Sequence, residues 1–314
     1  MEQNENYRKG CEAFDNKNYA SAIQYFTTYL LAKPDSIDVL AIRSAAYLRL
    51  DDFDNCNQDL ILQTKILTKQ RKQSPDSCDI LIKRGEIYRY LGRNKMAAAD
   101  FKKAIALNPQ CVEAYIGLGY IKSVQGNNEL TEALNQFLKA LALCPDNSQA
   151  LFNVASVYSR LEQMEKAVEY YLKCIKTRGD YLPLAYRSLA GVYSKLNSNE
   201  EAIACTEEFL SHHSGFDSDY SRLATYYEKK GDFNEAIVRL NTAVTLDNTN
   251  PINYYRLSLA YFKIADFQRA LENIDRAISI NNQSAYRTGY YLEHKMSVLL
   301  KLNKSDEAET TFLP

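Results

Sequence analysis

The clearest pattern of hydrophobic and polar positions lies in residues 79–109. It consists of two segments in which mostly apolar or small residues recur at helical spacing, separated by a short turn. The marked positions are Leu81, Arg84, Gly85 and Tyr88 in the first segment and Ala97, Phe101 and Ala104 in the second. Gly92 in the turn can take the backbone angle that ends a helix, and Pro109 cannot continue the second one. The pattern predicts two helices joined by a turn.

The small residues of this unit indicate close packing of its two helices. Gly85 and Ala97 carry little or no side chain where antiparallel helices approach each other. Tyr88 and Phe101 are large enough to fill the space beside them. Two such helices cannot bury both of their apolar faces alone. The sequence therefore predicts that further copies of the unit stack against it.

The alanine of the second helix recurs along the whole chain. With one cysteine in its place, it is found at Ala22, Cys56, Ala97, Ala133, Ala167, Ala202, Ala236, Ala270 and Ala308. The intervals are 34, 41, 36, 34, 35, 34, 34 and 38 residues. Self-similarity at this period predicts a single solenoid of nine units over residues 1–314 rather than two globular domains. The predicted units cover residues 3–35, 37–76, 78–110, 112–146, 148–180, 183–215, 217–250, 251–284 and, incomplete, 289–314.

The order of the marked residues in 79–109 resembles the tetratricopeptide repeat (TPR), whose signature is W-x2-L-G-x2-Y followed by A-x3-F and P. The resemblance extends over nearly all of the chain. It implies an all-α fold in which helix-turn-helix TPR units form a right-handed α-solenoid superhelix. It also implies a scaffold or adaptor for protein binding, in which the first helix of each unit lines a concave groove.

The fourth unit has two extra residues in its turn, and two other units depart further from the common length. The second has seven extra residues, which predict that its second helix continues through 61–73 and ends near Ser74. The basic residues of this extension are Lys65, Lys69, Arg71 and Lys72. A solvated helix end is the favoured interpretation of this basic patch. The last unit is short, so we expect either a chain cut from a longer protein or a frayed last turn.

Charge and hydrophobicity exclude several classes of partner. The chain has 38 basic and 39 acidic residues, and a net charge of −1 gives no general attraction to nucleic acid or to anionic lipid. Its first residues lack a basic start followed by an apolar run, and no stretch approaches eighteen consecutive apolar residues. The sequence therefore predicts a cytoplasmic protein without membrane insertion.

No pattern for catalysis or metal binding is found. The seven cysteines are scattered without a C-x-x-C motif, and of the three histidines only His212 and His213 are adjacent. Phosphate-binding loops, zinc-protease motifs and hydrolase nucleophile motifs are absent from the sequence. We therefore expect no disulfide, no metal, no cofactor and no enzymatic activity.

Two rows of polar residues on the predicted first helices are candidate contacts with a partner. One row stands seven residues before the alanine position, at Arg49, Arg160, Lys195, Lys229, Lys263 and Lys301. The other lies near the middle of these helices, at Asn153, Arg187, Arg222 and Arg256. Guanidinium groups there could bind the carboxylates or carbonyls of an extended peptide. Alternatively, the lysines are only solvated, and each arginine pairs with an acidic residue of a neighbouring unit.

An apolar cluster accompanies the second row near the C-terminus. Its members are Ile252, Tyr255, Leu259 and Phe262. They would form an anchor pocket for a partner side chain, or they pack against the C-terminal end of the chain.

These patterns, with the resemblance, predict a non-enzymatic scaffold in a multiprotein assembly that holds a protein or peptide carrying acidic residues. They leave the oligomeric state open. One alternative is a co-chaperone that binds the acidic C-terminus of a heat-shock protein. Most of the residues of such a clamp are missing, because its positions hold Tyr7, Cys11, Ile42 and Asp79, and only Lys83 matches. Another alternative is the substrate-recruiting region of a larger enzyme.

Overall fold

The computed structural model describes residues 2–281 and 285–311. In these ranges the chain forms eighteen α-helices and one short 3-10 helix, and it contains no strand. The all-α prediction is confirmed. The chain divides into two compact units, residues 1–157 and 158–314, and each is described by itself. The single solenoid stays a prediction where they join.

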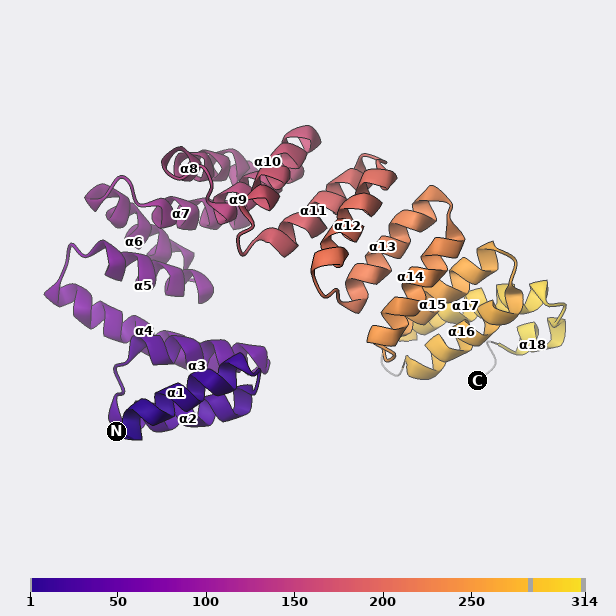
Figure 1. Ribbon diagram of the computed structural model, residues 1–314, viewed down its shortest axis with the longest axis horizontal. Helices are drawn as coiled ribbons and strands as arrows, with labels where there is room; N and C mark the ends of the chain where they lie inside the picture. Colours follow the sequence, from indigo (N-terminus) through magenta and orange to yellow (C-terminus); the bar gives the residue numbers. More distant parts are fainter. Residues whose placement is uncertain (1, 282–284, 312–314) are drawn as a thin grey trace. The chain divides into compact units, whose positions relative to one another are not determined.

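The first unit contains four helix-turn-helix pairs. Their helices are α1 (Glu2–Asp15), α2 (Tyr19–Ala32), α3 (Ile37–Arg49), α4 (Phe53–Gln73), α5 (Cys78–Tyr90), α6 (Asn94–Leu107), α7 (Val112–Gln125) and α8 (Leu130–Leu143), with the 3-10 helix η1 (Asn127–Glu129) between the last two. Each helix packs against the next one along the chain, and α5 also contacts α7 (Figure 1). The boundary between the two units falls within α9 (Ser148–Arg160).

The second unit continues the same pattern. Its helices are α10 (Met164–Thr177), α11 (Leu182–Lys195), α12 (Asn199–His212), α13 (Asp217–Lys230), α14 (Phe233–Leu246), α15 (Pro251–Lys263), α16 (Phe267–Ile280), α17 (Ala285–Lys301) and α18 (Ser305–Thr310). Consecutive helices from α10 to α18 pack against each other, and α15 also contacts α17. As predicted, the last pair has a short second helix of 6 residues.

A common turn joins the two helices of most pairs. One residue takes a left-handed backbone conformation, and the next residue is the N-cap of the second helix. The left-handed residue is Gly92 (φ 70°) before α6 and Gly231 (φ 88°) before α14, which confirms Gly92 as the end of the first helix. Before α4 and α14 the N-cap side chains of Asp52 and Asp232 accept a hydrogen bond from the third backbone N–H of the helix.

The lengthened second helix of the second repeat is confirmed. α4 has 21 residues, whereas α2 and α6 have 14, and its C-cap is Ser74. The Lys103 ammonium donates a hydrogen bond to the Pro75 carbonyl at 2.7 Å, which fixes the turn that follows. Three cations of its basic patch are exposed, as the solvated interpretation expects, but Arg71 is half-buried and lies 3.8 Å from Asp100.

The alanine position is buried in every pair of helices. Its relative exposure is 0% for Ala22, Ala97, Ala133, Ala167, Ala202, Ala236 and Ala270, 2% for Ala308 and 8% for Cys56. The prediction that this position packs inside each pair of helices is therefore confirmed.

In several pairs a small residue of the first helix faces the side chain that stands four residues after this alanine. Where the second helix carries phenylalanine four residues after the alanine, the first helix carries glycine, as in the pairs Phe101–Gly85 and Phe137–Gly119. A side-chain carbon on Gly85 would lie 2.7 Å from the ring of Phe101. Where leucine replaces the ring, as at Leu240, the facing residue is Ala224, and both belong to one core cluster. In both cases a small residue of the first helix lets the two helices approach closely.

Neighbouring repeats meet at the same rings. A side-chain carbon on Gly117 of α7 would lie 2.5 Å from the ring of Phe101, so glycines of two successive first helices flank one buried aromatic residue. Arg84, which stands at a usually apolar position of the repeat, is 5% exposed and donates two hydrogen bonds to Asp100 and one to Thr68 of the preceding repeat. Its charge is therefore matched inside the stack.

In the described part of the chain, no helix is long and apolar enough to cross a membrane.

We predict that Gly117→Ala destabilises the protein although alanine is the better helix former. The added carbon meets the ring of Phe101, and overpacking of this kind costs roughly 1 to 3 kcal/mol. Gly191→Ala in α11 is the matched control, because nothing lies within 4 Å of its added carbon. That variant should gain about 0.5 to 1 kcal/mol from helix propensity. Thermal unfolding followed by circular dichroism compares them, and equal stabilisation of both variants would contradict the close packing.

Candidate functional site

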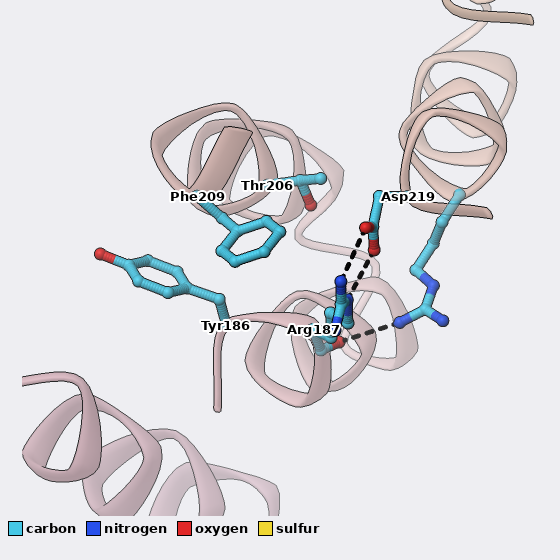
Figure 2. A pocket seen from close by; sticks show the side chains of 6 residues that line it. Tyr186, Arg187, Thr206, Phe209 and Asp219 are labelled. Carbon is cyan, nitrogen blue, oxygen red and sulfur yellow. Dashed lines mark hydrogen bonds and ion pairs between the residues drawn. The ribbon is translucent and has the colours of Figure 1, made fainter. Parts of the chain in front are cut away.

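An ion pair joins the first helices of two successive repeats in the second unit. Arg187 of α11 donates from Nε to Oδ1 of Asp219 on α13 at 2.6 Å and from Nη2 to Oδ2 at 2.8 Å, as Figure 2 shows. The guanidinium carbon also lies 5.1 Å from the ring centroid of Phe209. The Asp219 side chain is 2% exposed, and that of Arg187 is 25% exposed. Most of the binding capacity of Arg187 is thus used within the protein.

Asp219 also caps the start of α13, the helix on which it lies. Its Oδ2 accepts a hydrogen bond at 3.0 Å from the backbone N–H of Phe216, the N-cap residue of α13. Burial opposes ionisation of Asp219, but the hydrogen bonds from Arg187 and Phe216 outweigh it and lower the pKa of the carboxyl. Asp219 is therefore charged at neutral pH, and it fixes both the start of α13 and the guanidinium of α11.

Arg222 differs from Arg187 because its charge faces solvent. It follows Asp219 by three residues on α13 and is exposed, and its Nη1 lies 3.5 Å from the backbone carbonyl of Arg187. Within residues 2–281 and 285–311, no carboxylate lies within 4 Å of it. Its charge adds to the lowering of the Asp219 pKa. Arg222 is thus an exposed cation beside the neutralised ion pair of Arg187 and Asp219.

Arg256 on α15 is engaged in the same way as Arg187. Its Nη1 donates to Oγ of Ser221 at 2.7 Å and to the Ser221 carbonyl, and its Nη2 lies 2.9 Å from Oε2 of Glu228. The Arg256 side chain is 17% exposed. Internal pairing therefore describes Arg187 and Arg256, while Arg222 fits the interpretation in which an arginine faces a ligand. Asn153, the first member of the row, belongs to the first unit and is half-buried.

The row of basic residues at the ends of the first helices is exposed. Its members in the second unit that we proposed as contacts are Arg160, Lys195, Lys229 and Lys263. One of them also joins two repeats, because Lys229 donates from Nζ to Oγ of Ser194 at 2.6 Å. Nothing in the sequence marked Ser194 and Ser221 as the acceptors on the neighbouring helix.

The apolar cluster packs against the C-terminal end of the chain. The ring centroid of Tyr255 lies 4.8 Å from that of Tyr291 on α17, and Phe262 lies 5.5 Å from the ring of His294. Tyr255 and Phe262 pack against the core formed by α16 and α17, whereas Leu259 is half-buried. Of the two interpretations, the second describes these rings.

His294 lies in the middle of this aromatic packing. Its Nε2 is 2.9 Å from Oγ of Ser258, whose hydroxyl donates to the Ala270 carbonyl, so the imidazole is the donor. Burial lowers the pKa of His294 more than the contact with Ser258 raises it.

In the part of the chain that the structure describes, no three histidine, cysteine or acidic side chains are placed to hold a metal ion. The small cavity of Figure 2 is bounded by Tyr186, Arg187, Thr206, Phe209, Asp219 and Arg222. It is a narrow space between helices.

Comparison with known proteins gives matches to repeat families. The "TPR repeat" model matches residues 85–126 and 226–264, and a second model described as "Tetratricopeptide repeat" matches residues 148–181 and 253–284. These matches fall in both units.

Relatives resemble the chain over part of their length. Human "Tetratricopeptide repeat protein 13" is 27% identical over 177 residues, which are 56% of this chain and 20% of that protein. "Hsp70-Hsp90 organizing protein 3" of Arabidopsis thaliana is 23% identical over 241 residues, which are 68% of this chain and 37% of that protein. The chain thus spans well under half of either relative.

One solved structure supports the fold. A chain in the crystal structure of the "APC/C hetero-tetramer Cut9-Hcn1" superposes with a TM-score of 0.53 at 17% sequence identity. The match covers 90% of this chain and 52% of that chain. At this identity the likeness concerns the helical repeat fold alone.

We predict that Asp219→Ala destabilises the protein by roughly 2 to 3 kcal/mol, because it leaves Arg187 unpaired and α13 without its cap. Glu228→Ala should cost less, about 0.5 to 1 kcal/mol, because Arg256 keeps its bonds to Ser221. Since the pKa of Asp219 is lowered, its contribution is present at neutral pH and is lost as the pH falls below about 4. Urea unfolding of wild type and both variants at pH 7 and pH 3.5 tests these statements. Equal costs of the two variants at pH 7 would contradict the first, and an equal cost of Asp219→Ala at both pH values would contradict the second.

We also predict that protonation of His294 weakens the C-terminal repeat. A histidine with a lowered pKa in the folded state gives full stability above its unfolded pKa of about 6.5, and stability falls as the pH drops below that value. Hydrogen exchange of α17 should therefore speed up between pH 7.5 and 5.5, after correction for the intrinsic rate. His294→Gln should remove this dependence, and an unchanged dependence in that variant would refute the prediction.

Proposed function

We propose that this chain, which belongs to the tetratricopeptide repeat family, is a non-enzymatic cytoplasmic scaffold that holds a partner protein in a multiprotein assembly. Repeats of this family form protein-interaction scaffolds. What we propose for this chain in particular is the chemical character of its partner. We infer that an extended, acidic segment of the partner lies along the first helices of the second unit, in the concave groove that such helices line in this family.

The exposed, unpaired charge of Arg222 is the observation that carries this proposal. Arg187 of α11 and Arg256 of α15 lie on the first helices of the preceding and following repeats, and they are neutralised by Asp219 and Glu228. Arg222 is held beside the first of these pairs, where its guanidinium can bind a carboxylate without breaking an internal bond. A partner acid is thus expected at Arg222 rather than at each arginine of the row.

The exposed lysines extend this site along the helix ends. Lys195 and Lys263 are the last residues of α11 and α15, and Lys229 is the last but one of α13, so one of these cations stands near the end of each first helix. An extended segment with several acidic residues would meet them in register. Such contacts between exposed charges weaken in salt, because the Debye length is about 8 Å at physiological ionic strength.

The co-chaperone alternative is less favoured. Similarity to an Hsp70-Hsp90 organizing protein is the observation that supports it. Against it, most positions of such a clamp hold other residues, and the one matching cation, Lys83, lies 3.2 Å from Asp79. A substrate-recruiting role within a larger enzyme is a further alternative, since the relatives are much longer than this chain.

We predict that Arg222→Glu weakens binding of the native partner and leaves the fold intact. A charge-assisted hydrogen bond contributes roughly 1.5 to 3 kcal/mol, so binding should weaken at least tenfold. Arg276→Glu on α16 is the control, because it makes the same charge change at an exposed position of a second helix. Quantitative mass spectrometry of proteins retained from the native source by wild type and both variants measures the effect.

Circular dichroism and the melting temperature should be nearly unchanged in both variants. Proteins retained by wild type and by Arg276→Glu, but lost with Arg222→Glu and released by moderate salt, would be the expected partners. A folded Arg222→Glu protein that retains the same proteins at full yield would sink the proposal.

A further inference from the structure

A second surface of the same unit carries charges that the scaffold proposal does not use. An open cleft of about 480 Å³ lies between the end of α10, the first half of α11 and the end of α12. Lys176 and Arg178 line it from α10 and the residue after it, and His212 and His213 line it from α12 and its C-cap. Four nitrogen-bearing side chains from two segments thus face one space.

The two cations on this cleft are not neutralised. Both are exposed, and among the described residues neither has a carboxylate within 4 Å. Lys173, one turn earlier on α10, shows the contrast, because it pairs with Glu169 at 2.6 Å. Arg178 is moreover held with a left-handed φ of 52° at the C-cap of α10, where glycine would be the usual residue.

On the histidine side of the cleft, the ring of His213 is held in place. The ring of His213 stacks on Phe209 with centroids 4.9 Å apart and an interplanar angle of 11°. Its Nδ1 lies 3.2 Å from the Phe209 carbonyl, so the proton is on Nδ1 and the neutral ring offers Nε2 as an acceptor. This nitrogen can take a hydrogen bond from a ligand that carries an O–H.

One carboxylate, Glu208, also lines the cleft. Burial, followed by the hydrogen bond to Glu208, raises the pKa of Tyr186 to about 12, so the phenol stays protonated and donates to this carboxylate. With Lys176 and Arg178 opposite, one positive charge remains in excess even when both imidazoles are neutral. Ile175 and Leu182 supply apolar contacts beside the charges.

We infer that this cleft binds a phosphate monoester, with Lys176 and Arg178 on its oxyanion and the histidines on its remaining oxygens. A carboxylate has two oxygens and one charge, whereas a phosphate monoester has three free oxygens and a charge of about −1.5 to −2 at pH 7. Because its second pKa is about 6, part of it carries an O–H that can donate to Nε2 of His213. The monoester is carried either by a phosphorylated peptide or by a free phosphate compound.

The three histidines of the chain make the test specific. With 13C at Cε1 of histidine, the spectrum contains three side-chain signals, which His212→Gln, His213→Gln and His294→Gln assign. Wild type is titrated at pH 7 and constant ionic strength with a short phosphoserine peptide, the same peptide with serine, the same peptide with glutamate, inorganic phosphate and sulfate. Lys176→Ala/Arg178→Ala is the test variant, and Lys166→Ala/Arg276→Ala removes the same charge from exposed positions elsewhere in the unit.

We expect the phosphoserine peptide to shift the His212 and His213 signals saturably and to leave the His294 signal in place. Lys176→Ala/Arg178→Ala should weaken this binding at least tenfold, and the control should not. Saturation by inorganic phosphate with equal or higher affinity would identify a free phosphate compound as the source of the monoester. The inference is overturned if no saturable shift occurs, if sulfate or the glutamate peptide binds as tightly, or if the test variant binds like wild type. None of these outcomes depends on Arg222, so the scaffold proposal is tested separately.

Discussion

Close approach of neighbouring helices around a buried side chain is the constraint on which the repeats of this protein depend. Phe101 occupies the space between two first helices, and it fits because Gly85 and Gly117 present no side chain to it. A helix pair by itself would leave one side of this ring in water. The favourable transfer of the ring from water is therefore complete only when the next repeat is present. This dependence on a neighbour is what makes the stack cooperative over short range.

Polar groups at the repeat interfaces follow from the same close approach. Once first helices lie side by side, a long side chain on one can reach the backbone or a short polar residue of the other. Arg256 reaches Ser221, and Lys229 reaches Ser194. Bonds of this kind satisfy polar groups that the stacking would otherwise desolvate, and they hold neighbouring repeats in register. We propose that the exposed cations without an internal carboxylate partner are the ones that meet a binding partner.

The second unit thus presents two chemically different surfaces around one repeat. Tyr186 and Arg187 are adjacent on α11, and consecutive residues of a helix point about 100° apart. Arg187 belongs to the pair that leaves Arg222 exposed, while Tyr186 donates to Glu208 in the α10–α12 cleft. Under the two proposals, this repeat would contribute both to a surface for a peptide and to an anion site.

The sequence by itself determined the helical repeats, their register and the lengthened α4. These follow from local spacing, from turn residues such as Gly92 and from the recurring alanine, all of which act within one helix pair. It also placed the candidate residues on the first helices. Tertiary structure alone decided which of those residues are used internally. Arg222 and Arg256 stand fourteen residues before the alanine position and Arg187 stands fifteen residues before it. Among the described residues Arg187 and Arg256 have a carboxylate in reach and Arg222 has none, because a partner 28 or 32 residues away is set by how neighbouring helices pack. The cleft between α10, α11 and α12 could not be predicted from the sequence for the same reason. Its walls come from three helices whose side chains meet only after the repeats have stacked.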